Sequence, residues 1–367
     1  MSVLSVADCL SQASRFDTYS GSSSMAHAPH LVLGVDTHKD LHVAVLLDRL
    51  GRYLAAASFA TTDAANTDLV AWTRRYGQVT TAGVEGTGSY GYRLAQHLRD
   101  HGIDVVEVNR PDRARRRRRG KNDPVDAEAA ARAVLAGDAR AVPKDRNGAV
   151  GELRALVVAR RSAIKARTQA TNQLRALLVD GDDELRGRLR PLRKAHLARA
   201  CAQLAPAAGL QLALGSLGRR WLALNDEITS LDAAITSRVR RTAPRLLERH
   251  SVGVQTAAQL LITAGDNPGR LHSEAAFAAV CGASPVEASS GKTIRHRLNR
   301  GGDRAANSAL WTIANNRLMH DPRSRAYAAK RTALGSSRKE ILRCVKRALA
   351  RELYPLILDT LALPRLP

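Results

Sequence analysis

The chain has 367 residues, which is long enough for two or three domains with hydrophobic cores of their own. Lysine and arginine number 57 against 34 aspartates and glutamates, so the formal net charge at pH 7 is +23. A charge of this size predicts a polyanionic partner, with nucleic acid as the first candidate and an anionic membrane as the second. Aromatic residues make up only 4% of the chain, too few for a protein that grips single strands mainly by base stacking.

Membrane-spanning, secreted and zinc-binding classes find no support in the sequence. It contains no run of about 18 uncharged apolar residues, so no membrane span is expected. The first residues lack the basic and apolar regions of a secretion signal. The cysteines show no C-x-x-C spacing, which favours neither a zinc site nor a disulfide framework and suits a reducing cytoplasm. They are Cys9, Cys201, Cys281 and Cys344.

Residues 1–29 are predicted to form a disordered tail, because serine and glycine cluster there without a sustained hydrophobic period. Three strand-like runs follow, over 31–36, 42–47 and 53–57. The joints between them are so short that the three strands should form an antiparallel meander. The first strand ends in a carboxylate, Asp36.

The pattern then alternates between helix and strand. The predicted elements are helices over 63–76 and 89–101, strands over 79–85 and 104–108, and a further helix from about Asp123. Three strands followed by such an alternation predict an α/β domain with a mixed sheet, which we place at residues 30–147.

The densest positive charge of the chain lies between the last strand and that further helix. Its basic residues are Arg110, Arg113, Arg115, Arg116, Arg117, Arg118, Arg119 and Lys121, against Asp112 alone. Two interpretations stay open for this run. It is either a solvated, flexible loop, as blocks of like charge usually are, or a segment that contacts nucleic-acid phosphates.

A helical region is predicted over 148–245. Apolar residues recur within it with the 4-3-4-3-4 spacing of a heptad seam, at Leu217, Trp221, Leu224, Ile228, Leu231 and Ile235. The seam over 217–235 fits either helix packing within the chain or an intermolecular coiled coil. The remaining residues, 246–367, are predicted to form a mainly helical C-terminal domain with a loop or hairpin rich in serine, glycine and arginine at 282–300.

Four carboxylates are expected to meet at one end of the sheet. Asp36 and Glu85 each end a strand, and Asp123 and Asp126 open a helix with Asp123 as its N-cap and Pro124 at the first helical position. Four convergent acids need a cation between them, and hard oxygen ligands suit Mg²⁺ or Mn²⁺. Taken singly, Asp123 could be only a cap and Glu85 only a surface residue; together they predict a metal site for phosphodiester chemistry.

These acids lie in motifs that resemble the DEDD transposases of bacterial insertion sequences, the IS-one-ten family. The motifs are Gly34-Val35-Asp36-Thr37-His38-Lys39, Val84-Glu85-Gly86-Thr87-Gly88-Ser89-Tyr90, Lys121-Asn122-Asp123-Pro124-Val125-Asp126-Ala127, Gly282-Ala283-Ser284-Pro285 with Ser290-Gly291, and Arg300-Gly301-Gly302-Asp303. The resemblance covers roughly residues 31–357. It implies an N-terminal domain similar to the RuvC resolvase, which is RNase-H-like, and a C-terminal serine transposase domain.

The resemblance also implies roles for individual residues. Asp36, Glu85, Asp123 and Asp126 match the metal-binding acids of the family, and Ser290 matches its serine nucleophile, which attacks a DNA phosphate and holds the strand covalently. It further implies donor and target DNA as substrates, a structured bridge RNA as guide, and a homo-oligomer, at least a dimer and a tetramer at synapsis. The resemblance also implies that the protein acts in the bacterial cytoplasm, at the nucleoid.

The serine motif departs from the family at one place. Some members have Asn after the glycine of the last motif, whereas this chain has Gly302-Asp303 and reaches Asn307 only later. Ser289 adjoins Ser290, and only the Ser-Gly alignment chooses between them. The nearby basic residues, expected to contact nucleic acid, are Lys292, Arg295, Arg297 and Arg300, with His296 among them. None has the spacing of a general base, so the metal cluster, from this subunit or another, is the better activator.

The sequence therefore predicts an RNA-guided DNA transposase or recombinase with an RNase-H-like domain, a helical middle and a serine domain. A metal-dependent nuclease that hydrolyses strands with water is the first alternative. A basic protein that only binds nucleic acid is the second. The ordered acids at strand ends argue against the binding protein, and the distal Ser-Gly motif argues against the nuclease.

Overall fold

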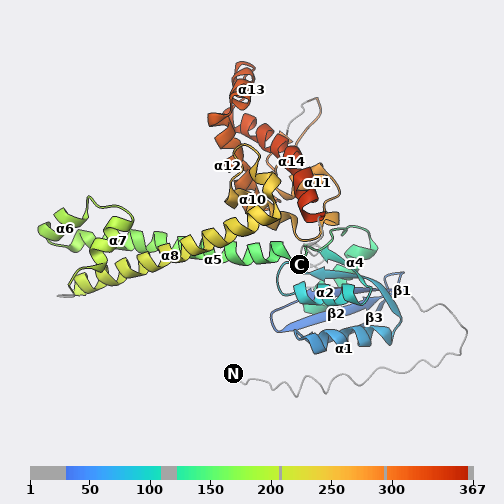
Figure 1. Ribbon diagram of the computed structural model, residues 1–367. Helices are drawn as coiled ribbons and strands as arrows, with labels where there is room; N and C mark the ends of the chain where they lie inside the picture. Colours follow the sequence, from blue (N-terminus) through green and yellow to red (C-terminus); the bar gives the residue numbers. More distant parts are fainter. Residues whose placement is uncertain (1–29, 109–121, 206–208, 293–295, 363–367) are drawn as a thin grey trace, which may run out of the picture. The chain divides into compact units, whose positions relative to one another are not determined.

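The computed structural model describes residues 30–108, 122–205, 209–292 and 296–362. The chain divides into two compact units, Met1–Val142 and Pro143–Pro367 (Figure 1). This division falls five residues before the boundary predicted at 147. The predicted tail at 1–29 and the basic run at 110–121 lie outside the described residues.

A five-stranded mixed sheet forms the centre of the first unit. Its strands are β1 (His30–Thr37), β2 (Leu41–Leu47), β3 (Tyr53–Ala60), β4 (Gln78–Glu85) and β5 (Asp104–Val108). They lie in the order β3-β2-β1-β4-β5, with β1–β2 and β2–β3 antiparallel and β1–β4 and β4–β5 parallel. The predicted meander and mixed sheet are confirmed, and the arrangement fits an RNase-H-like domain.

Helices cover both faces of this sheet, which explains why its central strands are apolar without alternation. The helices are α1 (Asp63–Arg74), α2 (Tyr92–Asp100) and α4 (Asp123–Leu135). Leu31, Leu33 and Val35 pack in one core cluster with residues of α1 and α2. Val32, on the opposite face of the same strand, packs in a second cluster with Ala127 and Ala131 of α4.

Two glycines let α4 approach the sheet more closely than any side chain would allow. A Cβ atom added to Gly34 of β1 would lie 2.0 Å from the carbonyl oxygen of Ala127. One added to Gly83 of β4 would lie 2.6 Å from the carbonyl oxygen of Ala130. The facing positions of α4 are alanines, so backbone packs against backbone. This contact brings the first turn of α4 to the end of β1.

We predict that Gly34→Ala destabilises the first unit by about 1–3 kcal/mol or more, because the new methyl group overlaps backbone atoms that cannot rotate away. Urea unfolding followed by circular dichroism measures the loss. Gly88→Ala is the matched control, since a Cβ at Gly88 meets no atom within 4 Å. Equal stabilities of the two variants would contradict the close-packing argument.

Two long antiparallel helices, α5 (Ala149–Leu177) and α8 (Gly209–Thr242), begin the second unit. At their far end lie the short η1 (Leu178–Asp180), α6 (Asp183–Leu189) and α7 (Ala195–Ala202) (Figure 1). The indole Nε1 of Trp221 donates to Thr171 Oγ1 at 2.8 Å, and the Arg167 guanidinium lies over the same ring at 5.4 Å. The Arg167 guanidinium also donates to Asn225 Oδ1 at 2.8 Å.

The predicted heptad seam lies on α8, and part of it is used within the chain. Trp221, Ile228 and Ile235 are buried, whereas Leu224 and Leu231 remain half-buried. Ile235 packs in a core cluster with Val150, Leu153 and Val157 of α5. The buried half of the seam therefore supports helix packing within the chain, and an intermolecular coiled coil stays a prediction.

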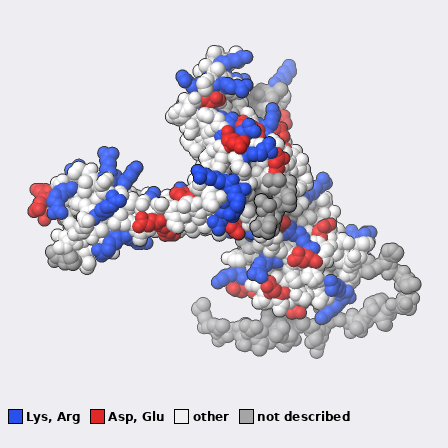
Figure 2. Space-filling view, in the orientation of Figure 1, with Lys and Arg blue, Asp and Glu red and all other residues white. Residues whose placement is uncertain are grey.

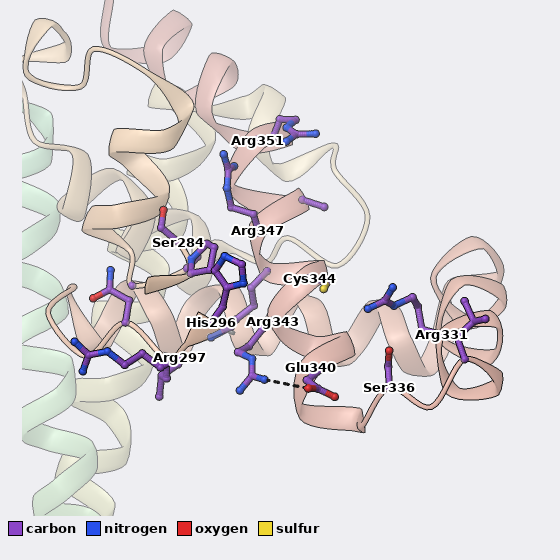
Figure 3. A pocket seen from close by; sticks show the side chains of 18 of the residues that line it. Ser284, His296, Arg297, Arg331, Ser336, Glu340, Arg343, Cys344, Arg347 and Arg351 are labelled. Carbon is purple, nitrogen blue, oxygen red and sulfur yellow. Dashed lines mark ion pairs between the residues drawn. The ribbon is translucent and has the colours of Figure 1, made fainter. Parts of the chain in front are cut away.

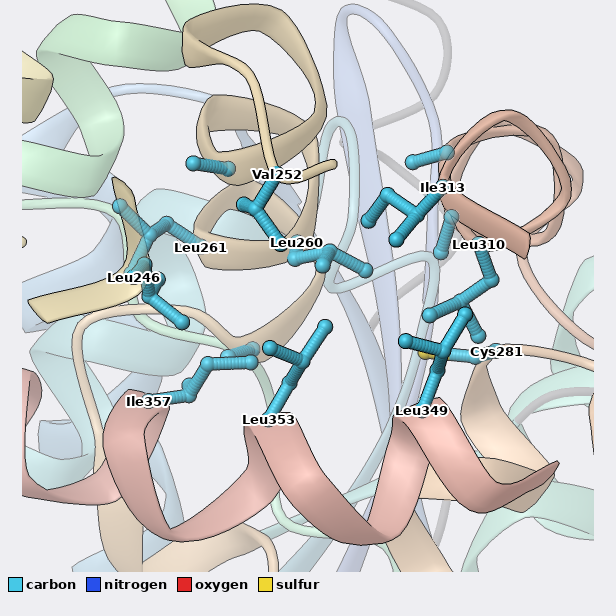
Figure 4. Packing of buried hydrophobic residues seen from close by; sticks show 14 of the residues in the cluster. Leu246, Val252, Leu260, Leu261, Cys281, Leu310, Ile313, Leu349, Leu353 and Ile357 are labelled. Carbon is cyan, nitrogen blue, oxygen red and sulfur yellow. The ribbon is translucent and has the colours of Figure 1, made fainter. Parts of the chain in front are cut away.

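The rest of the second unit is mainly helical, as predicted. Its elements are α9 (Pro244–Leu247), α10 (Val254–Ala264), η2 (Pro268–Arg270), α11 (Glu274–Val280), β6 (Val286–Glu287), β7 (His296–Arg297), α12 (Arg304–His320), α13 (Pro322–Ala333) and α14 (Arg338–Ala362). Figure 4 shows Leu260, Leu310 and Leu353 meeting in their common core. Helix α13, which has no buried residue, was not predicted because no apolar stripe marks it.

The same core contains residues from both sides of the domain boundary predicted at 245, including Val150 and Ile357. None of the described helices combines the length and apolarity needed to cross a membrane. The described cysteines Cys201, Cys281 and Cys344 are all free thiols. Burial raises the pKa of the Cys201 thiol to about 11, which makes that thiol inert rather than reactive.

Candidate metal centre and serine hairpin

Two of the predicted acids lie at the same edge of the sheet because β1 and β4 are parallel neighbours. Val35 pairs with Val84, so Asp36 and Glu85 come next on the two strands. Thr37 Oγ1 donates a hydrogen bond of 2.7 Å to the carbonyl oxygen of Glu85 and ties the two strand ends together. The predicted neighbourhood of the two strands is confirmed.

The other two acids lie in the first turn of α4, with one correction to the predicted cap. Asn122 occupies the N-cap position and Asp123 is the first helical residue, so the prediction of Asp123 as N-cap is wrong by one residue. The correction removes the alternative in which Asp123 serves only as a cap. Asp126 is buried, with 2% of its surface exposed, whereas the side chain of Asp123 is 47% exposed.

A histidine that sequence reasoning did not assign to the site joins the two groups of acids. His38 Nε2 lies 3.2 Å from Asp36 Oδ2 and 3.5 Å from Asp123 Oδ1. Ligand atoms of Asp36, His38 and Asp123 all lie within 4.8 Å of one another. The available signal was the position of His38 two residues after Asp36, which places both side chains on one side of an extended segment.

The electrostatics of the group favour a bound cation. Burial raises the pKa of Asp36 above its ordinary value, and the nearby charges of Asp126 and Asp123 raise it further, while His38 opposes them. Three aspartates within electrostatic reach of one another repel unless a positive charge lies between them. Carboxylate oxygens suit Mg²⁺ or Mn²⁺, and an imidazole nitrogen suits Mn²⁺ better than Mg²⁺.

Glu85 is the predicted ligand that the structure places less closely. It ends β4 at the same sheet edge and is half-buried. It is not one of the three described residues whose ligand atoms lie within 4.8 Å of one another. Asp36 and Asp123 therefore have ligand atoms close together, and Asp126 lies near enough to act on the charge of Asp36. Glu85 lies at the same sheet edge but outside this group.

The predicted nucleophile lies on a hairpin of the second unit. Strands β6 and β7 pair antiparallel, with Val286 opposite Arg297 and Glu287 opposite His296. Ser290 lies between these strands and is exposed, as is Ser289. Gly291 has φ of 55°, a left-handed conformation that a Ser-Gly turn allows at little cost. The hairpin displays both serines to solvent.

The basic residues predicted around the serine are also exposed where they are described. These are Lys292, Arg297 and Arg300, while Arg295 lies outside the described residues. His296 is exposed too, on β7. Such groups are accessible to phosphate, and none is buried beside Ser290 as a fixed general base would be.

The segment from the last motif to Asn307 contacts the Gly282 turn rather than the serine. Asn307 Nδ2 donates to the carbonyl oxygens of Cys281 and Gly282, at 2.9 Å in each case. Asp303 caps α12, accepting from the Ala305 amide at 2.8 Å and from Thr263 Oγ1 at 2.7 Å. Despite the departure at Gly302-Asp303, this segment therefore still carries a polar residue, Asn307. Its side chain contacts the Gly282 turn at the base of the hairpin.

Comparison with known proteins agrees with the motifs. Residues 33–181 match a family model described as a transposase, of the DEDD type. Residues 243–329 match a second model described as the transposase IS116/IS110/IS902 family. Each model covers less than half of the chain, and both show that the chain resembles the IS110-family transposases. The first matched segment contains all four predicted acids, and the second contains Ser290.

A curated relative supports the same assignment over part of its length. The chain is 30% identical over 153 residues to a protein of Streptomyces coelicolor, named as an uncharacterized 43.6 kDa protein of the insertion element IS110. The match covers 41% of this chain and 38% of that relative. The relative is similar to this chain in sequence, and its name assigns it to an insertion element without stating an activity.

We predict opposite effects of Asp36→Asn on stability and on metal binding. Without metal, the neutral amide relieves repulsion and desolvation at a buried site, so the melting temperature should rise. With Mn²⁺ the wild type should be stabilised by RT ln(1 + [L]/Kd), or about 2.7 kcal/mol at a hundredfold excess over Kd, and the variant should not.

Thermal melts in EDTA and in a Mn²⁺ series measure both effects. Asp63→Asn is the matched control, because Asp63 lies in the same unit on α1 and pairs with Arg93 at the surface. Stabilisation of the Asp36 variant by Mn²⁺ to the same extent as the wild type would contradict the metal site.

Proposed function

We propose that this protein is a metal-dependent DNA transposase of the IS110 family that cuts and rejoins donor and target DNA. The observation that carries the proposal is the convergence of Asp36, Asp123 and Asp126, with His38, at one edge of an RNase-H-like sheet. The similarity of both segments to transposase models supports DNA as the substrate of that site.

The acids would act by holding a divalent cation against the DNA backbone. Asp36 and Asp123 would supply oxygen ligands and Asp126 buried negative charge, and Glu85, at the end of β4 on the same sheet edge, would complete the set. Bound Mg²⁺ or Mn²⁺ supplies charge stabilisation for the oxygens that enter and leave the phosphate. The α4 N-terminus also contributes positive dipole charge at the site.

Ser290 is the proposed nucleophile. Its Oγ would form an ester bond to a backbone phosphorus while the phosphorus–oxygen bond to the neighbouring sugar breaks, and the serine proton passes to the leaving sugar oxygen through the site. In rejoining, a sugar hydroxyl of the new strand attacks the same phosphorus and releases serine. No external energy source is required, because one phosphate ester replaces another.

We also propose that a structured bridge RNA guides the reaction, as the family resemblance implies. One loop would pair with target DNA and another with donor DNA, so sequence recognition would not depend on protein contacts to base edges. The net charge of +23 suits two polyanionic partners, and Figure 2 shows lysine and arginine spread over several elements. A location in the bacterial cytoplasm, with the DNA, completes the proposal.

We predict that Ser290→Ala abolishes a covalent protein–DNA adduct while Ser289→Ala retains it at least in part. The adduct is measured by denaturing electrophoresis with end-labelled DNA, before and after protease treatment. EDTA should abolish the adduct in every variant, because the acidic site then lacks its cation.

The alternatives give different results in the same assay. Efficient cleavage with no protein-linked band in any variant would favour the water-hydrolysing nuclease. Binding with neither cleavage nor adduct in the wild type with Mg²⁺, Mn²⁺ and the RNA would favour a non-catalytic binding protein. An adduct that persists in Ser290→Ala and vanishes in Ser289→Ala would reassign the nucleophile.

The oligomer is proposed to form through the half of the α8 seam that is not buried within the chain. Leu224 and Leu231 keep part of their surface exposed, and strand exchange requires two DNA duplexes to be brought together. Leu224→Gln with Leu231→Gln should weaken self-association at least tenfold, because about 1.4 kcal/mol corresponds to tenfold in Kd.

Multi-angle light scattering over a concentration series measures this change. Leu212→Gln is the matched control, since Leu212 is 55% exposed on the same helix outside the seam. Unaltered self-association of the double variant would assign the seam to packing within the chain alone.

A further inference from the structure

The second unit contains a cavity of about 830 Å³ beside the base of the serine hairpin. Its walls are the Gly282–Pro285 turn, the β7 segment of the hairpin, the connection between α13 and α14, and one side of α14. Figure 3 shows His296 and Arg297 on one side of this cavity, Arg343 of α14 in its middle and Arg331 with Ser336 on the other side.

The cavity carries a surplus of positive charge. Its cationic lining residues are Arg297, Arg331, Arg343, Lys346, Arg347 and Arg351, and Glu340 is the lining carboxylate. Glu274 lies outside the lining and pairs with Arg347 at 2.9 Å and with Arg351 at 3.0 Å. Arg343 meets Glu340 only at 3.9 Å, the long limit of an ion pair. The described carboxylates therefore leave the Arg343 side of the cavity largely uncompensated.

One of these cations is buried without a carboxylate. Lys346 is 5% exposed, its Nζ donates to Asn307 Oδ1 at 2.9 Å, and no described carboxylate forms an ion pair with it. Burial, and secondarily Arg343, lower its pKa. A buried ammonium with a neutral partner and a neighbouring guanidinium is costly unless an anion joins them.

Two further donors in the same walls have no hydrogen-bond partner in the part of the chain that the structure describes. Arg331 Nε and Arg347 Nη1 are shielded from solvent and make no hydrogen bond with any described residue. Buried guanidinium nitrogens normally have acceptors, so their absence at two lining residues indicates acceptors that come from a ligand. Guanidinium groups match the paired oxygens of a phosphate.

We propose that this cavity binds the phosphodiester backbone of a single nucleic-acid strand next to the phosphate that Ser290 attacks. Its volume exceeds the space of one phosphate group, and Pro285, Leu298 and Leu334 give it apolar walls suited to a sugar or base. The hairpin base that forms one wall continues to Ser290. This inference rests on the proposed transposase function and adds a binding site for its substrate.

The Lys346–Asn307 contact links this site to the serine hairpin. Asn307 accepts from Lys346 and donates to the carbonyl oxygens of Cys281 and Gly282, where the Gly282–Pro285 turn begins. The side chain of Asn307 thus contacts both Lys346, where an anion would bind, and the turn that leads into the hairpin.

The test measures binding of end-labelled single-stranded DNA and of RNA of the same sequence, by anisotropy over a salt series in EDTA. The pocket variant is Arg331→Gln with Arg343→Gln. The matched control is Arg323→Gln with Lys330→Gln on the exposed face of α13, outside the cavity lining, so both variants lose two positive charges. Arg343→Gln alone is a milder second variant, because this side chain is 43% exposed.

We expect the salt slope to fall by about 1.4 in the pocket double variant and by about 0.7 in Arg343→Gln, corresponding to about 0.7 per single-strand phosphate contact. The control should change clearly less. A loss of slope on DNA supports a site for the substrate strand. A loss confined to RNA overturns the inference, because the strand that Ser290 attacks is DNA. Equal slopes for pocket and control variants on both strands overturn the inference.

Failure of this inference is distinguishable from failure of the proposed function. Binding in EDTA needs no cleavage, and covalent adduct formation by the wild type with metal tests the function separately. If the wild type forms the adduct normally but the pocket variants keep the wild-type salt slope, the cavity site is wrong and the proposed function stands.

Discussion

The close contact between α4 and the sheet is the constraint on which the rest of the first unit depends. Gly34 and Gly83 provide space for the backbone of α4 at Ala127 and Ala130. That spacing fixes where the helix begins relative to β1, and so where Asp123 and Asp126 stand relative to Asp36. A side chain at either glycine would displace the carboxylates that are proposed to bind metal. The close packing of glycines against alanines thus sets the positions of the carboxylates.

Each proposed site gathers charges of one sign that repel one another. The charges are negative at the metal site and positive in the cavity of the second unit. In the first unit, burial raises the pKa of Asp36, and repulsion from Asp126 and Asp123 raises it further. In the second, Lys346 is buried with a neutral partner and two guanidinium nitrogens lack acceptors among the described residues. The first arrangement favours a cation and the second an anion. A bound metal ion would satisfy the first and a nucleic-acid phosphate the second, as the proposed strand transfer requires.

Local periodicity predicted the elements well where the burial pattern was strong. The strands of the meander, the parallel β4 and β5 and the long α5 were all indicated by their apolar residues. It did not predict α13, which buries nothing, nor α6 and α7, which are too short to establish a helical period. It also placed the cap of α4 one residue late, because Asn122 and Asp123 are both good caps and only the backbone distinguishes them.

The amino-acid sequence by itself determined the order of the acids along the chain, the element that carries each of them, the serine motif and the positive charge. Tertiary structure alone decided that His38 bridges Asp36 and Asp123, that Asp123 does not cap its helix, and that half of the α8 seam is used within the chain. It alone gathered Arg331, Arg343 and Lys346 into one cavity with the Gly282 turn. The reason is physical: periodicity reports which side of a single element is buried, whereas a site depends on distances between elements that only their packing fixes.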